Sequence, residues 1–234
     1  MYVLDNETLK QALFSILAAQ GAALMGIADM SEVISGPMQT GVSVAVPVPA
    51  NIVKDLQTMP TKEYYDAYYT LNATLDNIVS HGAAFLQKHG YQAQTNTTKV
   101  VKQDSNWCTP LPHKTVATRA GLGWIGKNCL LVTREYGSAV RLSSLLTDAP
   151  LPAGTPINES HCGACSVCVQ RCPAKALTGT LWNTTLNREA LFHKEACKEM
   201  QIQRMKQATG IETDLCGLCF AVCSYTQRYL KKAL

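Results

Sequence analysis

The stretch that decides the second half of this chain is His161–Pro173, which reads HCGACSVCVQRCP. Its cysteines follow the pattern C-x2-C-x2-C-x3-C and are followed directly by a proline. Cys197 comes next as a single cysteine, and residues 216–223, CGLCFAVC, then follow the pattern C-x2-C-x3-C. Eight of the ten cysteines therefore lie within residues 162–223.

The first run has the spacing with which bacterial ferredoxins bind [4Fe–4S] clusters, and in it the fourth cysteine ligates the other of two cubes. A gap of two residues lets successive thiolates reach different corners of one cube, whereas the gap of three starts a helix and carries the next thiolate away. We therefore predict two cubes and a protein that moves single electrons. The first would be bound by Cys162, Cys165, Cys168 and Cys223, and the second by Cys172, Cys197, Cys216 and Cys219.

Two other uses of cysteine explain this pattern less well. Structural zinc takes two C-x2-C pairs for each tetrahedral site, which a continuous C-x2-C-x2-C-x3-C-P run does not supply. Disulfides need an oxidising compartment, and residues 1–5, MYVLD, do not start a basic region followed by an apolar core. We expect no signal peptide and a cytoplasmic protein.

Composition is that of an ordinary globular protein. The 234 residues are 47% hydrophobic and 16% charged, enough for one substantial core and a small added module. No apolar run reaches the roughly 20 residues of a membrane-spanning helix. The net charge of +4 is spread along the chain, with its densest basic part at 228–232, so charge does not argue for nucleic-acid binding.

Hydrophobic spacing predicts a mixed α/β fold class. Apolar residues recur at helical intervals in some segments and alternate in others, and the segment 149–156 is rich in proline and small residues. We predict an α/β domain over 1–155 and a cluster domain over 156–234. The expected helices are 5–20, 62–89, 112–121 and 187–206, and the expected strands are 22–28, 41–48, 91–102 and a pair at 129–133 and 138–147 around the turn 134–137.

A second informative segment is Arg119–Asn128, RAGLGWIGKN. Its three glycines permit positive φ angles and close approach of the backbone to another group. It does not meet the requirements of a dinucleotide-binding fingerprint, because the residues before it are predicted helical and no helix is expected after it. A tight turn without a ligand is the alternative.

Together with SSLLTD at 143–148 and the eight cysteines, this segment resembles the epoxyqueuosine reductase family, over about residues 111–223. The resemblance implies a nitroreductase-like, cobalamin-binding α/β domain followed by a ferredoxin-like two-cluster domain, a core that reductive dehalogenases share. It also implies that the clusters pass electrons to the cobalt of a corrinoid.

Two features depart from that family. The family continues with a helical-repeat region that helps to hold tRNA, whereas this sequence stops eleven residues after Cys223, so we do not expect tRNA as a partner. The family's proton-donating aspartate precedes its Ala-Gly-Leu-Gly by a fixed distance. An ungapped match places Trp107 there, and Asp104 takes the role only with an insertion of three residues.

The resemblance also indicates residues around the corrinoid. For cofactor binding we predict Gly121, Gly123, Trp124, Gly126, Lys127, Tyr68 and Tyr69, and for catalysis Asp104. Each has a structural alternative: the glycines a turn, the tyrosines a core stripe, Lys127 a solvated surface and Asp104 a turn former.

The sequence therefore leaves three functional hypotheses. The first is an iron–sulfur oxidoreductase that delivers low-potential electrons to a corrinoid, either its own cofactor or one held by a partner protein. The second is a ferredoxin-like electron carrier whose α/β domain docks a partner or binds flavin. The third is a genuine epoxyqueuosine reductase. All three need an external electron donor, of the flavodoxin or ferredoxin type, and none needs a membrane.

Overall fold

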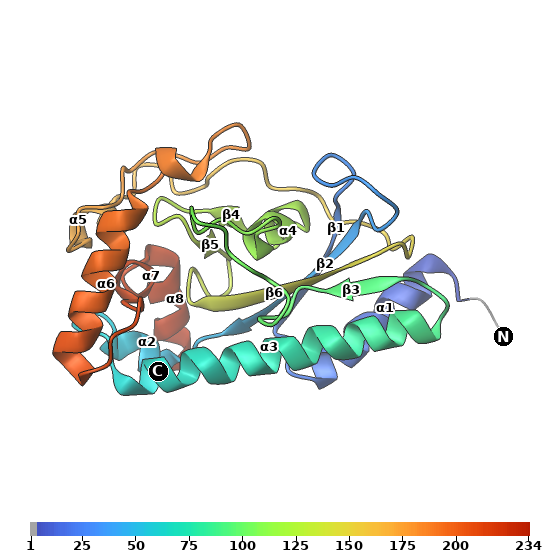
Figure 1. Ribbon diagram of the computed structural model, residues 1–234, viewed down its shortest axis with the longest axis horizontal. Coiled ribbons are helices and arrows are strands. Elements are labelled where there is room, and N and C mark those ends of the chain that lie inside the picture. The colour runs from blue at the N-terminus through green and yellow to red at the C-terminus, as the bar shows by residue number, and fades with distance from the viewer. Residues whose placement is uncertain (1–3) are drawn as a thin grey trace. The chain divides into compact units, whose positions relative to one another are not determined.

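Residues 4–234, which the computed structural model describes, divide into two units that interleave along the chain (Figure 1). Unit 1 comprises the residues up to Val46, Leu71–Leu122 and Arg141–Ile157, and unit 2 comprises Pro47–Thr70, Gly123–Val140 and Asn158–Leu234. The last change of unit falls between Ile157 and Asn158, two residues beyond the predicted boundary. The division into sequential domains 1–155 and 156–234 stays a prediction.

Unit 1 is built on a four-stranded sheet in the order β1-β2-β6-β3. β1 pairs with β2 in antiparallel register, with Ile27 opposite Val42, and β3 pairs with β6 in the same sense, with Thr95 opposite Leu145. The bounds are Leu24–Asp29 for β1, Thr40–Pro47 for β2, Ala93–Thr95 for β3 and Val140–Thr147 for β6.

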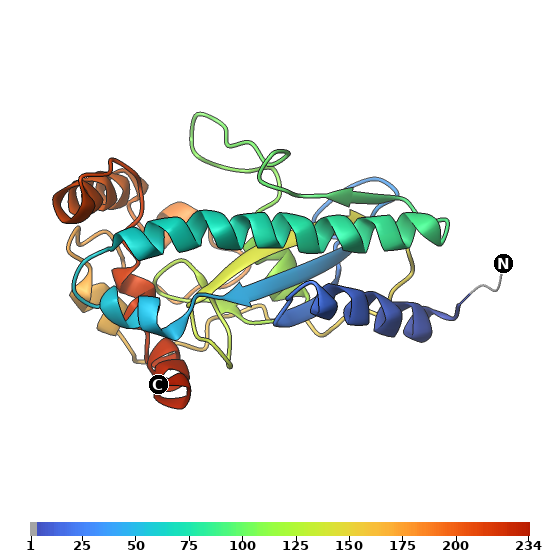
Figure 2. The same cartoon turned by 90° about the horizontal axis from the view of Figure 1, so that it is seen from below.

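Two helices cover one face of this sheet, α1 (Asn6–Ala19) and the part of α3 (Lys62–Lys88) that belongs to unit 1 (Figure 2). Alternation along β2 directs every second side chain to this face. The buried core there joins Leu9, Leu13 and Leu17 of α1, Val42, Val44 and Val46 of β2, Leu75, Ile78 and Leu86 of α3, and Leu145 of β6. Asp5 caps α1 by accepting the backbone N–H groups of Glu7 and Thr8.

The opposite face carries α4 (His113–Arg119), which packs against β1. Val116 of α4 is fully buried with Ala28 and Met30. A Cβ atom on Gly41 would lie 2.8 Å from Val116 Cγ1, so the glycine in β2 allows the helix to approach the sheet this closely. Unit 1 thus has three layers.

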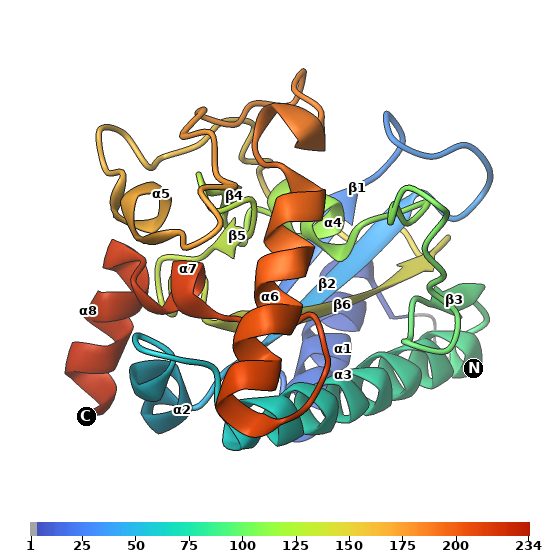
Figure 3. The same ribbon diagram turned by 60° about the vertical axis from the view of Figure 1, so that its left-hand side comes forward.

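Unit 2 consists of one longer helix, α6, and shorter elements joined by loops (Figure 3). Within it α7 packs between α5 and α8, and α2 contacts α8. The ring of Tyr64 meets that of Phe220 edge to face, with 5.8 Å between ring centroids. The elements are α2 (Ala50–Asp55), the start of α3, β4 (Trp124–Ile125), β5 (Leu131–Val132), α5 (Val167–Arg171), a 3-10 turn at Arg188–Ala190, α6 (Lys194–Thr209), α7 (Leu218–Ala221) and α8 (Ser224–Ala233).

The mixed α/β class is confirmed, as are α1, β1, β2, α3 and α4. In the described part of the chain, no helix combines the length and apolarity needed to cross a bilayer.

Three element predictions are wrong in detail. The strand expected at 91–102 has only three residues, because the backbone N–H groups of Val100 and Val101 turn back to the carbonyl of Thr97. The segments 129–133 and 138–147 do not form a hairpin, since β5 pairs with β4 and β6 joins the unit 1 sheet. The helix expected from 187 begins at Lys194, because Asn187 caps the separate 3-10 turn.

A half-buried histidine in unit 1, His113, starts α4 and contacts β6. The Nδ1 atom of His113 is 3.0 Å from Ser144 Oγ, and Asn96 Nδ2 donates to the same hydroxyl. Burial, followed by the positive charge of Arg141, lowers the pKa of His113 from 6.5 to about 4, and Asp76 opposes this shift.

We therefore expect unit 1 to lose stability as the pH falls. The neutral ring stabilises the fold above pH 6.5, and this contribution is lost as the pH falls towards 4, by about 2 kcal/mol between pH 7.5 and pH 5. Urea unfolding followed by circular dichroism would measure it. His113→Gln should flatten the pH dependence, whereas Ser144→Ala should retain most of it. Equal slopes for wild type and His113→Gln would contradict the assignment.

Candidate metal centre

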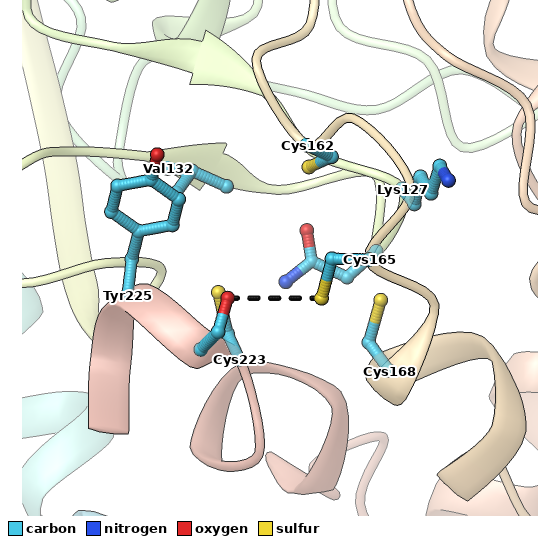
Figure 4. A pocket seen from close by; sticks show the side chains of 9 residues that line it. Lys127, Val132, Cys162, Cys165, Cys168, Cys223 and Tyr225 are labelled. Carbon is cyan, nitrogen blue, oxygen red and sulfur yellow. Dashed lines mark hydrogen bonds between the residues drawn. The ribbon is translucent and has the colours of Figure 1, made fainter. Parts of the chain in front are cut away.

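Four of the predicted cluster ligands line one pocket in unit 2 (Figure 4). We call Cys162, Cys165, Cys168 and Cys223 the first group. Its loop turns tightly, because Cys165 N–H donates to the Cys162 carbonyl and Gly163 between them has a φ of 53°. Cys168 lies in α5, and Cys223 is the N-cap of α8. Segments 55 residues apart in the sequence, at Cys168 and Cys223, thus contribute to one site.

The electrostatics of the first group show how near its thiols lie to one another. Burial raises the pKa of Cys168 to about 12, and the neighbouring Cys223, Cys162 and Cys165 raise it further in that order. Ser224 Oγ lies 3.7 Å from Cys165 Sγ, at hydrogen-bonding distance for sulfur. The structure therefore brings the four predicted ligands together.

The remaining cysteines of the module form a second group, Cys172, Cys197, Cys216 and Cys219. Burial raises the pKa of Cys219 well above its usual value, and Cys216, Cys197, Cys168 and Cys172 add to the effect. Burial also raises the pKa of Cys197 in α6, whereas the Gln201 side chain opposes this by donating to its sulfur over 3.1 Å. Because Cys168 acts on Cys219, the two groups adjoin.

The chemistry of these thiols fits iron–sulfur clusters. A buried thiolate is costly alone but is stabilised when a metal supplies the compensating charge. In residues 4–234 no three His, Cys, Asp or Glu side chains converge to hold a single ion. A four-iron cube binds each thiolate through a different iron, so its ligands surround a volume and need not converge on one point. The assignment of each cysteine to its cube stays a prediction.

The glycine-rich segment supports the first group from a neighbouring hairpin. A Cβ atom on Gly123 would lie 2.2 Å from the Val132 carbonyl oxygen, and one on Gly126 would lie 2.6 Å from Val132 Cγ2. Asn128 holds the turn by accepting from Leu130 N–H and donating to Ser138 Oγ. The close packing of the β4–β5 hairpin therefore requires glycine at these two positions.

Lys127 is buried against the first group. Only 9% of the residue is exposed, and its Nζ donates to the Gly163 carbonyl over 2.8 Å. Together with Asn128 and Val132 it lines the pocket of the four cysteines. The alternative of a solvated surface lysine is therefore wrong.

Trp124 is enclosed by aromatic rings that flank the cluster ligands. Its ring stacks on His161 and meets Tyr225 edge to face, both at 4.9 Å between centroids. Only 1% of Trp124 is exposed. Its contacts lie inside unit 2, and the predicted role in corrinoid binding stays a prediction.

The other predicted site residues make contacts within their local structure. Gly121, in unit 1, ends α4 with a φ of 76°, and a Cβ there would lie 2.6 Å from the Thr155 carbonyl oxygen. The Asp104 carboxylate accepts from the backbone N–H groups of Asn106 and Cys108, as a turn former does. The rings of Tyr68 and Tyr69 pack 5.3 Å apart on α3, and Tyr69 is half exposed. The cofactor and catalytic roles of these four residues stay predictions.

Several residues at the site were absent from the sequence prediction. Tyr225, Ser224 and Asn128 line the first pocket, and Gln201 donates to Cys197. Their closeness in sequence to predicted ligands could have indicated them. Ser224 and Tyr225 directly follow Cys223, and Gln201 lies one helical turn beyond Cys197.

We expect Gly123→Ala to disrupt cluster binding. The new methyl group meets the backbone of β5 and costs about 3 kcal/mol, since a carbonyl oxygen cannot move away as a side chain can. Iron analysis and urea unfolding would measure the loss. Gly90→Ala is the control, because its Cβ meets nothing within 4 Å and the φ of 91° costs only about 1 kcal/mol. Equal iron content in both variants would contradict the prediction.

Comparison with known proteins agrees with this geometry. Residues 161–226 match a family model described as a 4Fe-4S double cluster binding domain. The epoxyqueuosine reductase of Pseudomonas aeruginosa is 46% identical over 70 residues, which are 30% of this chain and 19% of that protein. That of a Synechococcus species is 34% identical over 138 residues, 56% of this chain and 42% of that protein. The chain thus spans less than half the length of these curated relatives.

Solved structures share the fold at lower identity. A catabolic reductive dehalogenase superposes with a TM-score of 0.74 at 16% identity, covering 99% of this chain and 35% of that one. A crystal structure of epoxyqueuosine reductase superposes with a TM-score of 0.63 at 21% identity, covering 94% of this chain and 66% of that one. This chain is therefore similar to epoxyqueuosine reductases, and its residues 161–226 match a 4Fe-4S double cluster binding domain.

Proposed function

We propose that this protein is an iron–sulfur reductase that passes single electrons through two [4Fe–4S] clusters to a corrinoid. The observation that carries the electron-transfer part is the pair of adjoining cysteine groups within the matched domain. When bound, cubes ligated by cysteine supply one-electron carriers that reach very low potentials.

The protein's own residues define how the electrons would travel. The second group comes from the end of α5, from α6, and from α7 with the loop before it, and the first comes from the loop before α5, from α5 and from the start of α8. Cys168 of the first group acts on Cys219 of the second, so electrons would pass directly between neighbouring sites. Cys165 of the first group is exposed and the other seven cysteines of the two groups are half-buried, and solvent exposure is one of the factors that set cluster potentials.

The corrinoid part is supported by the shared fold. One structural neighbour is a reductive dehalogenase whose structure suggests a mechanism for B12-dependent dehalogenation. The resemblance in the segment 119–128 points the same way. A corrinoid would supply a low-valent cobalt nucleophile, and it would be this chain's own cofactor or belong to a partner protein. The flavin-binding carrier remains an untested alternative.

Epoxyqueuosine reduction on tRNA is the second candidate. The curated relatives carry that name, and one solved epoxyqueuosine reductase holds an epoxyqueuosine-modified tRNA stem loop. The chain covers 66% of that structure. Formation of queuosine from epoxyqueuosine-tRNA, with a strong reductant supplied, would establish this activity.

The electron donor we propose is a small acidic redox protein of the flavodoxin or ferredoxin type. Helix α8 starts at the first group and carries three exposed basic side chains, Arg228, Lys231 and Lys232, and no acidic ones. Arg228 lies over the ring of Tyr225, with 4.5 Å to the centroid, and Tyr225 lines the pocket. A positive surface beside a cluster attracts a negatively charged donor.

Cluster content tests the electron-transfer part. After anaerobic reconstitution we expect about eight irons per chain, because each cube holds four. Cys197→Ala should retain about half of the iron, since it removes one ligand of the second cube. Cys108→Ser, at an exposed cysteine outside both groups, should retain all of it. Equal iron content in all three proteins would contradict the ligand assignment.

Cobalamin binding tests the corrinoid part. Reduced protein should change the visible spectrum of added cob(II)alamin, and Cys197→Ala should slow this change. A fully loaded protein that neither binds nor reduces cobalamin would contradict the corrinoid proposal and leave the clusters standing.

Charge reversal on α8 tests the donor surface. Lys231→Glu/Lys232→Glu should slow cluster reduction by flavodoxin about tenfold at low salt, and the difference should disappear at high salt as charges are screened. Lys88→Glu/Lys99→Glu, an equal charge change at exposed lysines of unit 1, is the matched control. A similar slowing in both double variants would contradict a specific docking surface.

A further inference from the structure

Lys127 is a buried cation without an anionic partner in the part of the chain that the structure describes. Its ammonium donates to the Gly163 carbonyl, which is neutral. Among residues 4–234 no carboxylate lies within ion-pair distance of it. Burial of a charge is costly unless an opposite charge compensates for it. Negative charge from another source close to Lys127 would offset this cost.

The first group provides that source. Lys127 lines the same pocket as all four of its thiols and bonds to the loop that joins Cys162 to Cys165. A cube held by four thiolates carries net negative charge, and one-electron reduction adds to it. Net charge near a cluster is one of the factors that set its potential.

We propose that Lys127 is the buried counter-ion of the first cluster and raises its reduction potential. The inference rests on the proposed two-cluster function and goes beyond it by assigning a role to one side chain. A fixed positive charge stabilises the reduced, more negative cube more than the oxidised one. The charge is shielded from solvent, so salt screens its effect little.

The two clusters would then differ in their electrostatic surroundings. The second group receives a neutral amide N–H from Gln201, whereas the ammonium of Lys127 bonds to the loop between Cys162 and Cys165 of the first. At equilibrium this difference favours reduction of the first cluster over reduction of the second. Lys127 is thus a positioning residue for the electron and has no part in the chemistry of a substrate.

A merely structural role would have a different signature. An anchor for the Cys162–Cys165 loop needs a hydrogen-bond donor at the Gly163 carbonyl but no charge. Glutamine retains a donor and removes the charge, whereas arginine retains both. The two substitutions therefore separate the charge from the hydrogen bond.

The experiment is a redox titration of the reconstituted protein, followed by electron paramagnetic resonance. In Lys127→Gln one of the two midpoint potentials should fall, with about a tenfold lower ratio of reduced to oxidised cluster at a fixed solution potential, which corresponds to 59 mV for one electron. Lys127→Arg should remain close to wild type. Lys88→Gln, at an exposed lysine of unit 1, should shift neither potential. The shift should persist at high salt.

Each other outcome decides the question. Lys127→Gln with full iron and both potentials unchanged overturns the proposal and leaves a loop anchor. If Lys127→Gln binds only about half of the iron, Lys127→Arg decides: full loading at wild-type potential supports the need for charge, and failure to load overturns it. A wild-type protein that binds no clusters would instead refute the proposed function.

Discussion

The gathering of eight thiols in two adjoining groups is the constraint on which the rest of unit 2 depends. Each must lose its proton to ligate iron, yet burial raises the pKa of Cys168, Cys197 and Cys219. A bound metal supplies the positive charge that reverses this preference. We therefore expect the elements around the groups to assume their final arrangement with the clusters.

The β4–β5 hairpin shows how this constraint reaches residues distant in sequence. Its glycines let two strands meet at a distance that no side chain tolerates, and the turn between them holds Lys127 against the Cys162–Cys165 loop. Trp124 closes the same region by packing between His161 and Tyr225. The segment through which the sequence resembles epoxyqueuosine reductases is, within unit 2, the support of the first group.

Sequence reasoning predicted most of the regular elements and named the four cysteines that line one pocket. Periodicity succeeded for α1 and α3, each of which buries one face, and for β2, whose valines alternate although both of its faces are buried. It failed at 91–102 and 187–193, where local hydrogen bonds to Thr97 and Asn187 compete with the expected element. It also paired β5 with β6, because adjacency in sequence does not show which strand supplies the partner.

The sequence by itself determined the ligand chemistry, because the reach of a thiolate over two or three intervening residues is a short-range property of the chain. The tertiary structure alone decided the environment of those ligands. The hydrogen bond that helps to hold the buried Lys127 joins it to Gly163, 36 positions away in the sequence. The adjacency of Cys168 to Cys219 joins residues still farther apart. Such contacts depend on how the whole unit packs, which no local spacing specifies.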